Sequence, residues 1–406
     1  MAEIVYNQNQ VFEVGIIGGG PAGLSAAYYC AKAGLDTIVL EEHHQIGKPV
    51  HCGEGLSAFA IKRMGLKDIP KEALGLKVKG IRIVFPDGTT TIYREEGYDL
   101  NKDIFEQYLA QRAVKEGASV KTSTRVVSVN RKNGLWSLYS PVSVVKTKVL
   151  IDATGYQSMT NQLLKINQTK LLLNAGAQYL IENVENDGFI EFYIDPKLAP
   201  EGYLWIMPKE GEKANVGLVC NEPKIVQKNL KIFLEKKGLS EKKIIRPFGG
   251  MIPCGGPLPK TYFDGLIMVG DAAGFTSPMF EGGTQLALKT GQLAAEAIIE
   301  AYNLGKEKKL SDPYEEENLK GYEIRWRKEL PPYEKILKGK KYFYSFSEEE
   351  LNKLGRILPA DLTTMSIIDK IKILIRLFSI SPNLIRKNFF EAMNTFSYST
   401  GKNYGW

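Results

Sequence analysis

Three glycines near the N-terminus, Gly18, Gly20 and Gly23, constrain the fold of this 406-residue chain more than any other feature. They follow an apolar stretch, Phe12 to Ile17, and precede a stretch of helical character, Leu24 to Ala33. Glycines at this spacing between a strand and a helix let backbone N–H groups and the helix N-terminus approach a pyrophosphate. We therefore predict a dinucleotide-binding turn here rather than a glycine-rich turn that binds nothing.

The segment after the predicted helix completes a nucleotide-binding unit. Gly34 is the residue type that most often ends a helix in the left-handed conformation. A short apolar run, Thr37–Leu40, follows it and leads directly to Glu41. In βαβ units of this kind, an acid at the end of the second strand accepts hydrogen bonds from the ribose of the dinucleotide. Glu41 is the predicted ribose ligand.

Two later segments favour FAD over NAD as the cofactor. The run Ile267–Ala273 matches the second FAD fingerprint of the large monooxygenase and reductase superfamily, and its Asp271 is expected on the ribityl-phosphate side. Gly283 then begins a helix whose N-terminus would stabilise the negative charge of a reduced flavin. The run Asp152–Gly155 resembles the strand end that closes over the nucleotide in that superfamily. Three markers in the superfamily's order predict FAD.

The order of these segments predicts a discontinuous α/β architecture. Strand-like stretches such as Phe189–Ile194, Gly202–Met207 and Asn215–Cys220 separate the two nucleotide-binding segments, and a hairpin is expected at Ile81–Tyr93. We predict a Rossmann-type FAD-binding domain of the glutathione-reductase and hydroxylase type, an inserted antiparallel-sheet substrate domain and a helical C-terminal part. The predicted bounds are 1–75, 98–165 and 247–310 for the FAD-binding domain, 76–97 and 166–246 for the substrate domain, and 311–406 for the helical part.

Three further segments resemble one family. Pro49–Ser57 (PVHCGEGLS) resembles the cysteine-glycine loop of archaeal geranylgeranyl and digeranylgeranylglycerophospholipid reductases. Gly202–Pro208 (GYLWIMP) resembles their aromatic strand motif, and Gly249–Pro253 also fits. The resemblance extends from about residue 12 to about residue 300, and the combination of motifs is specific. The chain departs from the family pattern at Met207, where an aromatic residue is usual, and at Lys102, where arginine is common.

The resemblance implies a set of cofactor contacts and three residues at the reaction centre. Cys52, Tyr203 and Trp205 are the implied catalytic residues. Beside Gly18, Gly20 and Gly23 of the turn, the implied FAD contacts are Ala22, Glu41, Cys52, Gly53, Gly55, Lys102, Val126, Asp271, Gly283 and Thr284.

Each implied catalytic residue also has a plainer interpretation. The thiol of Cys52 could donate a proton or steer an alkene, or Cys52 could be a small residue that fits a tight loop against the flavin. Tyr203 and Trp205 alternate along a strand, so their rings share one face. That face would suit a long isoprenoid chain, although ordinary packing of a sheet places aromatic residues in the same way.

The resemblance implies reduction of isoprenoid (geranylgeranyl) double bonds in prenyl lipids by hydride transfer from reduced FAD, as in the synthesis of archaeal membrane lipids. An FAD-dependent monooxygenase or hydroxylase, an electron-transfer flavoprotein and a non-enzymatic prenyl-lipid carrier remain as alternatives. Coupled NADPH oxidation and hydroxylation would favour the first of these. No second dinucleotide fingerprint is present, so the implied electron donor is either NAD(P)H or ferredoxin.

Composition excludes several other classes. The net charge of +7 arises from basic residues interleaved with acidic ones, which indicates a solvated surface and no nucleic-acid partner. The four cysteines, Cys30, Cys52, Cys220 and Cys254, form no C-x-x-C pair, so neither a structural zinc site nor an iron–sulfur cluster is expected. All three histidines fall between His43 and His51, and we predict no metal site.

The chain is predicted to be cytoplasmic. Its polar start, Met1–Gln10, lacks a signal sequence, and no apolar run approaches the length needed to span a bilayer. The segment Met365–Ile380 places Ile367, Ile371, Leu374, Ile375 and Phe378 on one helical face, with Lys372 and Arg376 on the other side. This helix could contact a membrane surface peripherally, or it could pack against the body of the protein.

Overall fold

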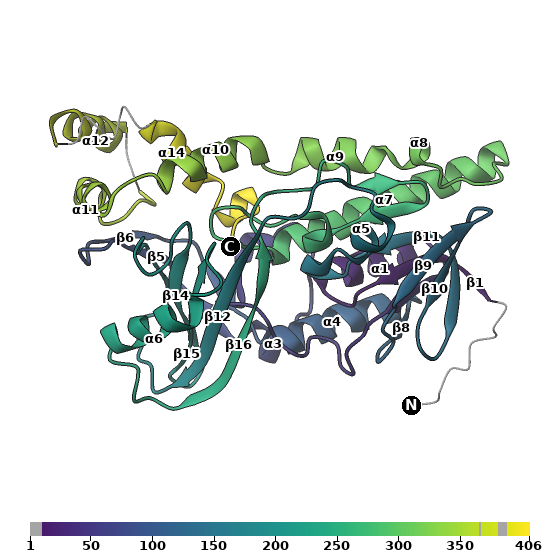
Figure 1. The fold of residues 1–406 in the computed structure, drawn as a ribbon, viewed down its shortest axis with the longest axis horizontal. Helices are drawn as coiled ribbons and strands as arrows, with labels where there is room; N and C mark the ends of the chain where they lie inside the picture. Colours follow the sequence, from purple (N-terminus) through teal and green to yellow (C-terminus); the bar gives the residue numbers. More distant parts are fainter. Residues whose placement is uncertain (1–9, 365–366, 381–387) are drawn as a thin grey trace.

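The computed structural model describes residues 10–364, 367–380 and 388–406. Residues 1–9 of the predicted polar start and the first two residues of the segment 365–380 lie outside the described part. Two sheets stand side by side in the molecule, and helices of the last hundred residues form a layer along the top of both (Figure 1). The chain ends near the middle of the molecule, between the two sheets.

The first sheet has the parallel core that the N-terminal glycine motif predicts. Its strands follow the order β17-β18-β11-β1-β2-β8, with β9 and β10 added beside β11. β1 pairs in parallel with both β2 and β11, and β11 pairs in parallel with β18. The bounds are β1 (Val11–Ile17), β2 (Thr37–Leu40), β8 (Ser119–Lys121), β9 (Ser128–Lys132), β10 (Leu135–Tyr139), β11 (Val144–Asp152), β17 (Tyr262–Phe263) and β18 (Leu266–Met268).

Three helices cover this sheet and bury its apolar strands. They are α1 (Pro21–Lys32), α4 (Lys102–Lys115) and α7 (Thr284–Lys308). The helices α1 and α7 approach so closely that a Cβ added at Gly291 would lie 2.2 Å from the carbonyl oxygen of Ala22. Gly34 lies just beyond the C-terminal end of α1 in the left-handed region (φ 80°), as the sequence predicts. The two FAD fingerprints, about 250 residues apart in the chain, thus meet through their helices.

The second sheet is antiparallel except at one pairing. Its order is β16-β12-β15-β14-β13-β5-β6, and only β13 with β5 runs in parallel among its described pairs. The predicted domain boundary at residue 247 falls within β16, which pairs along most of β12. The bounds are β5 (Gly80–Val84), β6 (Thr90–Tyr93), β12 (Leu173–Glu182), β13 (Phe189–Tyr193), β14 (Tyr203–Lys209), β15 (Lys213–Cys220) and β16 (Ile244–Pro253), with helix α6 (Val226–Lys236) on one face.

A small three-stranded sheet lies between these two units. Its order is β3-β7-β4, with β3 (Gly55–Ser57), β7 (Gly97–Asp99) and β4 (Leu76–Val78). The strand β3 is formed by the last three residues of the cysteine-glycine loop, so the small sheet holds one end of that loop in place. The short helices of the first half of the chain are α2 (Ala58–Arg63), α3 (Lys71–Leu74) and α5 (Met159–Leu164).

The C-terminal part is helical, as predicted. Its helices are α8 (Glu316–Leu319), α9 (Gly321–Glu329), α10 (Tyr333–Phe343), α11 (Glu348–Ile357), α12 (Ile367–Ile380) and α14 (Phe389–Ser397). Buried aromatic side chains fix this layer to the first sheet. The Tyr322 hydroxyl donates to the carbonyl of Met268 at 2.9 Å, and Trp326 Nε1 donates to Thr261 Oγ1 at 3.0 Å. No helix among the described residues is both long enough and apolar enough to cross a membrane.

Candidate functional site

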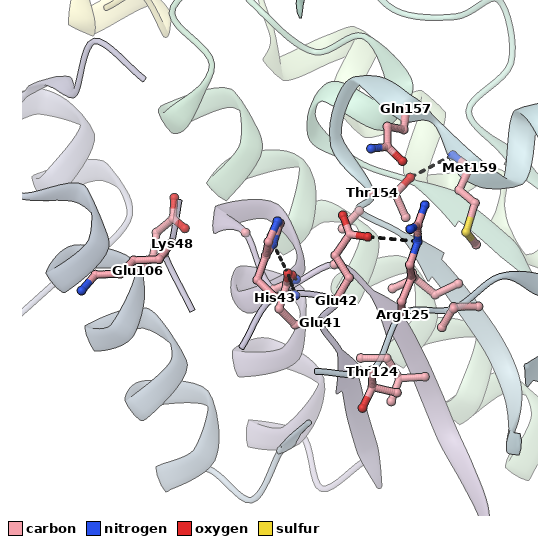
Figure 2. Close-up of a pocket in the computed structure, with 18 of the residues that line it drawn as sticks. Glu41, Glu42, His43, Lys48, Glu106, Thr124, Arg125, Thr154, Gln157 and Met159 are labelled. Atoms are coloured by element: carbon pink, nitrogen blue, oxygen red, sulfur yellow. Dashed lines mark hydrogen bonds and ion pairs between the residues drawn. The ribbon is translucent and has the colours of Figure 1, made fainter. Parts of the chain in front are cut away.

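A cavity of about 370 Å³ opens at the carboxyl ends of β1, β2 and β11. We call it the nucleotide cavity. Figure 2 shows how its labelled side chains surround the space, with dashed lines joining His43 to Glu41, Glu42 to Arg125 and Thr154 to the backbone of Met159. It is lined by Ile17, Gly18, Gly19, Gly20, Leu40, Glu41, Glu42, His43, Gly47, Lys48, Pro49, Glu106, Thr124, Arg125, Val126, Val127, Ala153, Thr154, Gln157 and Met159.

The three motif glycines have different roles in this cavity. Gly18 has a φ of 107°, and an added Cβ would lie 2.2 Å from the carbonyl oxygen of Ala153. A Cβ at Gly23 would lie 2.0 Å from the carbonyl oxygen of Gly18. Gly20 has open space around it instead, and it precedes a helix that has no side-chain cap and no acidic residue in its first turn. The helix N-terminus is therefore free to bind an anionic diphosphate beside Gly20.

Glu41 is buried and lines the cavity. One carboxylate oxygen accepts the backbone N–H of Gly19 at 2.7 Å. The other accepts the backbone N–H of His43 at 2.8 Å and lies 2.6 Å from His43 Nδ1. These bonds orient the carboxylate beside the glycine turn, in the place where a ribose hydroxyl would meet it.

Asp152, the first residue of the run Asp152–Gly155, has a structural role. Its side chain is fully buried at the end of β11. One oxygen accepts from both the N–H and the hydroxyl of Thr154, at 3.0 and 2.6 Å, and the other accepts in the same way from Thr160. These four bonds fix the turn at Thr154, which lines the cavity, so Asp152 positions the turn rather than contacting a ligand.

Lys102, Cys52 and Asp271 come together at the start of α4. Burial disfavours the charge on Lys102, but the carboxylate of Glu106 at 2.8 Å, with Cys52 and Asp271 beyond it, raises the pKa of the ammonium group above its usual value. Burial raises the pKa of Asp271 to about 6, and Lys102 acts in the opposite direction. A buried cation between two segments predicted to contact the flavin can balance negative charge on the flavin or its phosphates.

The Cys52 thiol is not activated. Burial raises its pKa, and the charge of Lys102 together with the N–H of Glu54, 3.2 Å from Sγ, offsets this only in part. A nucleophilic cysteine needs a lowered pKa. Cys52 is therefore a neutral thiol at neutral pH, and it can act as a weak hydrogen-bond donor.

The cysteine-glycine loop is held by a buried charge cluster that the sequence did not reveal. Lys209 Nζ lies 2.7 Å from Glu54 Oε2 and 2.9 Å from Asp99 Oδ1. Glu54 also accepts from Asn215 Nδ2 at 2.8 Å and from the backbone N–H of Lys102 at 3.0 Å. Although Asp99 is close to Lys209, neither of its oxygens is in hydrogen-bonding geometry with any described group. Burial raises the pKa of Asp99 to about 7, with Lys209 opposing the shift.

The two aromatic residues of β14 occupy different environments. Trp205 Nε1 donates to Gln178 Oε1 at 2.8 Å, and Gln178 Nε2 donates to the carbonyl of Cys52 at 2.7 Å. Trp205 therefore helps to set the position of the cysteine-glycine loop. Tyr203 belongs to a buried aromatic cluster with Phe192, Phe280, Phe343 and Phe396, and its hydroxyl donates to the carbonyl of Phe280 at 2.6 Å.

The other FAD contacts that the resemblance implies lie on the cysteine-glycine loop, beside Asp271 or near the nucleotide cavity. A Cβ at Gly53 would lie 2.7 Å from Met207 Sδ, so the residue at the family's usual aromatic position packs on the loop. A Cβ at Gly283 would lie 3.3 Å from Asp271 Oδ1, and Thr284 is the first residue of α7. Val126 lines the nucleotide cavity, whereas Ala22 lies in the first turn of α1 outside it.

Residues 399–406 pack against the cysteine-glycine loop and the loop before α7, a contact that the sequence did not predict. Trp406 is buried, and its Nε1 donates to Glu95 Oε2 at 2.6 Å. A Cβ at Gly282 would lie 3.0 Å from Trp406, and one at Gly55 would lie 3.6 Å from its ring. The only signal for this in the sequence is indirect, because the segment contains several glycine and aromatic residues.

These observations fit FAD. The open space at Gly20, the uncapped N-terminus of α1 and the carboxylate of Glu41 suit the ADP half of a dinucleotide. Lys102, Asp271 and the start of α7, which the resemblance implies as flavin contacts, lie close together. Among the described residues, no group of three histidine, cysteine or acidic side chains is placed to hold a metal ion.

Comparison with known proteins adds independent support. A family model described as the geranylgeranyl reductase catalytic domain matches residues 173–252, and one described as pyridine nucleotide-disulphide oxidoreductase matches residues 15–174. The digeranylgeranylglycerophospholipid reductase of Methanocaldococcus jannaschii is 36% identical over 93% of this chain and 97% of its own length. The corresponding reductase of Methanothrix thermoacetophila is 32% identical over 90% and 96%.

Solved structures agree with these matches. A geranylgeranyl bacteriochlorophyll reductase-like protein from Thermoplasma acidophilum superposes with a TM-score of 0.83 at 28% identity, covering 94% of this chain and 99% of its own. The flavin-dependent halogenase PltM, 16% identical with a TM-score of 0.67 over 86% of this chain and 79% of its own, shares the fold alone. The identity over nearly the whole length and the shared fold show that this chain belongs to the geranylgeranyl reductase family of FAD-dependent oxidoreductases.

Proposed function

We propose that this protein reduces the isoprenoid double bonds of a prenyl lipid such as a digeranylgeranylglycerophospholipid. The observation that supports this most is the contact between the cysteine-glycine loop and β14, through Trp205, Gln178 and the carbonyl of Cys52. This contact joins the two segments that distinguish the family from other flavoproteins of the same fold. Bound FAD, once reduced, supplies a hydride to one carbon of the double bond.

The chain's own residues would bind and orient the apolar substrate. Tyr203 and Trp205 are almost fully buried, so a prenyl chain that reached them would leave water behind. An isolated alkene is a poor hydride acceptor, and correct alignment must supply much of the rate. Cys52, as a neutral thiol, would contact the substrate or the flavin without forming a covalent bond.

The experiment that tests this function is anaerobic. The purified protein is reduced with dithionite and mixed with a geranylgeranyl lipid, and product masses are compared with the extent of flavin reoxidation. Gains of H2 in proportion to reoxidised flavin support the proposal. A saturated lipid with the same headgroup is the matched control and should leave the flavin reduced. Unchanged geranylgeranyl lipid would contradict the proposal and favour oxygen-dependent hydroxylation.

The electron donor is a separate part of the proposal. We propose that NAD(P)H or a reduced ferredoxin delivers electrons to the flavin. Anaerobic mixing with NADH, NADPH and ferredoxin in turn identifies the donor, because only a true donor bleaches the flavin spectrum at a useful rate. Failure of all three would contradict this part and leave the lipid reduction itself intact.

We further propose that α12 brings the site to a membrane surface. Ile368, Ile371 and Ile375 share one helical face and are 63%, 50% and 63% exposed, whereas Leu377 on the opposite side is fully buried. Lys372 and Arg376 are also exposed next to that face. The predicted role of Ile371 and Ile375 fits this arrangement, while the side chains of Ile367, Leu374 and Phe378 lie outside the described part.

An exposed apolar face with basic neighbours suits an anionic lipid surface. Because α12 lies at the outer end of the helical layer, it could reach such a surface without moving the first sheet (Figure 1). Cosedimentation with anionic vesicles should fall when Ile371 and Ile375 are both changed to serine. The matched control changes Ile244 and Ile245, which are exposed on β16. Equal binding by both variants would contradict the membrane role of α12.

A further inference from the structure

The loop that precedes α7 carries a carboxyl group in an unusual position. Glu281 has a φ of 49°, in the left-handed region where glycine is least strained. Two backbone hydrogen bonds close the loop around it, from Glu281 N to Ser277 O and from Ser277 N to Gly282 O, both at 2.9 Å. A residue other than glycine at such a position costs on the order of 1 kcal/mol, so its side chain needs a reason to be there.

The carboxyl group is held on one side and unpartnered on the other. Asn174 Nδ2 donates to Glu281 Oε1 at 2.7 Å, and Asn174 is itself only 2% exposed. Cys254 Sγ in turn lies 3.4 Å from Asn174 Oδ1. Glu281 Oε2 is buried and has no hydrogen-bond partner among the described residues. A buried carboxylate whose oxygen accepts no hydrogen bond is costly, and protonation removes the buried charge.

The surroundings favour the protonated form. Burial raises the pKa of Glu281 to about 7, and Lys340, Asn174 and Tyr203 oppose the shift. The aromatic rings of Phe280 and Tyr203, with centroids 5.3 Å apart, make the neighbourhood apolar. The titratable and charged groups that interact with this carboxyl group from the packed elements are Tyr203 on β14, Cys220 at the end of β15, Cys254 just after β16, Lys340 on α10 and Tyr344 just after α10.

The group also lies next to the predicted reaction centre. Tyr203 is close enough to both Glu281 and Cys52 for each of them to raise its pKa, after the larger effect of burial. Glu281 is followed by Gly282 and Gly283, and a Cβ at Gly283 would approach Asp271 to 3.3 Å. The carboxyl group therefore stands between the aromatic cluster and the residues predicted to contact the flavin.

We propose that Glu281 is the acid that gives a proton to the substrate double bond, with Asn174 fixing the orientation of its carboxyl group. This inference rests on the proposed function. One C–H bond forms with the hydride that reduced FAD supplies, and the π bond breaks. The second C–H bond forms with the proton of the Glu281 carboxyl group, whose O–H bond breaks. The resulting carboxylate regains a proton from solvent before the next turnover.

Glu281 suits this task better than Cys52. A proton donor works best when its pKa is near the working pH, because it is then both protonated and acidic enough to give the proton away. Glu281 meets both conditions at neutral pH. The Cys52 thiol is protonated too, but its raised pKa makes it the weaker acid.

The first test uses Glu281→Gln in the FAD-loaded protein. Glutamine keeps the size and can still bond to Asn174, but it has no acidic proton. Reoxidation of the reduced flavin by geranylgeranyl lipid should slow about 10²–10⁴-fold, the usual contribution of a positioned acid. Glu281→Gly removes the acid and also relieves the left-handed backbone, so it should be as slow while being at least as stable.

A second readout does not depend on turnover. The infrared C=O stretch of protonated carboxyl groups should titrate near pH 7 in the wild-type protein, with contributions from both Glu281 and Asp99. The difference between the wild-type and Glu281→Gln titrations isolates the Glu281 component. Cys52→Ser is the comparison for the kinetic test, since it leaves Glu281 in place.

The outcomes separate the inference from the proposed function. An active wild type whose Glu281→Gln variant is equally fast overturns the inference and leaves the function standing, and strong slowing only in Cys52→Ser would assign the proton to the thiol. A wild type inactive on every prenyl lipid overturns the function. In that case the infrared titration still decides whether Glu281 holds a proton near neutral pH, and its absence overturns the inference.

Discussion

The nucleotide cavity and the aromatic cluster draw their residues from different spans of the chain. All residues that line the cavity lie between Ile17 and Met159. The aromatic cluster brings together Phe192, Tyr203, Phe280, Phe343 and Phe396, which come from β13, β14, the loop before α7, α10 and α14. The cavity is set by close backbone approaches, and the cluster by the burial of side chains far apart in sequence.

This difference has a chemical consequence. A phosphate-binding turn needs backbone N–H groups and space, which glycines provide locally. A site that holds a proton in an apolar setting needs several elements to exclude water around one acid. The buried charge cluster of Glu54, Asp99, Lys209 and Asn215 connects the two regions, since Glu54 belongs to the cysteine-glycine loop and Lys209 to the end of β14.

The largest expected effect comes from breaking that connection. Lys209→Met leaves the buried carboxyl groups of Glu54 and Asp99 without their cation, which should lower the free energy of unfolding by about 3–5 kcal/mol. Denaturant titration measures this loss. The triple variant with Glu54→Gln and Asp99→Asn should recover part of it, because the uncompensated charges are then removed. A single variant as stable as wild type would show that the cluster does not hold the regions together.

The pH dependence of stability should follow from the buried acids. The pKa of Asp99 is raised from 3.8 to about 7, so the folded protein binds this proton more tightly than the unfolded chain does. The stabilisation is complete below pH 3.8 and is lost as the pH rises through 7. Asp271 and Glu281 act in the same direction, with pKa values of about 6 and 7.

Unfolding free energy measured between pH 5 and pH 8 should therefore fall with rising pH. Each unit of pKa shift corresponds to about 1.4 kcal/mol, so the loss should be on the order of a few kcal/mol. Asp99→Asn should make the slope shallower without removing it, since the other two acids remain. An unchanged slope in Asp99→Asn would mean that Asp99 is ionised in the folded protein throughout this range.

A smaller effect should separate the roles of the motif glycines. Gly23→Ala puts a methyl group 2.0 Å from the carbonyl oxygen of Gly18, and the forced shift should cost about 1–3 kcal/mol. Gly20→Ala meets nothing within 4 Å, so its unfolding free energy without FAD should stay within about 0.5 kcal/mol of wild type. It should bind FAD more weakly, because the new methyl group points into the space for the diphosphate.

Calorimetry without FAD and fluorescence titration with FAD check these two variants. Because the turn is built from local backbone contacts, we expect Gly23→Ala to lose stability and Gly20→Ala to lose affinity for FAD. Equal loss of stability in both would show that the turn is built as a single packed unit.

The smallest expected effect concerns the aromatic cluster. Tyr203→Phe keeps the ring and its packing but removes the hydroxyl that donates to the carbonyl of Phe280. Loss of one buried hydrogen bond should lower the unfolding free energy by about 1 kcal/mol. Denaturant titration of this variant beside the wild type measures the loss. An unchanged unfolding free energy would show that the hydroxyl bond to Phe280 does not stabilise the cluster.

The sequence alone determined the nucleotide-binding half of this protein. The glycine spacing, Glu41 and the run Ile267–Ala273 predicted a parallel sheet and FAD, because the required backbone geometry depends on neighbours within a few residues. The cysteine-glycine loop and β14 followed from their resemblance to a family. By contrast, no local pattern marked β12 as a long strand, since glycine, alanine and polar residues interrupt it.

Only the tertiary structure decided how the other half of the site is completed. Lys209 and Glu54 are 155 positions apart, and Asn174 and Glu281 are 107 apart. Trp406 reaches Glu95 across 311 residues. Each of these side chains reads in sequence as an ordinary charged, polar or aromatic residue. Burial shifts a pKa or fixes a hydrogen bond only after distant elements have packed together and excluded water, so the acid, its partner and the supporting charges are properties of the folded chain.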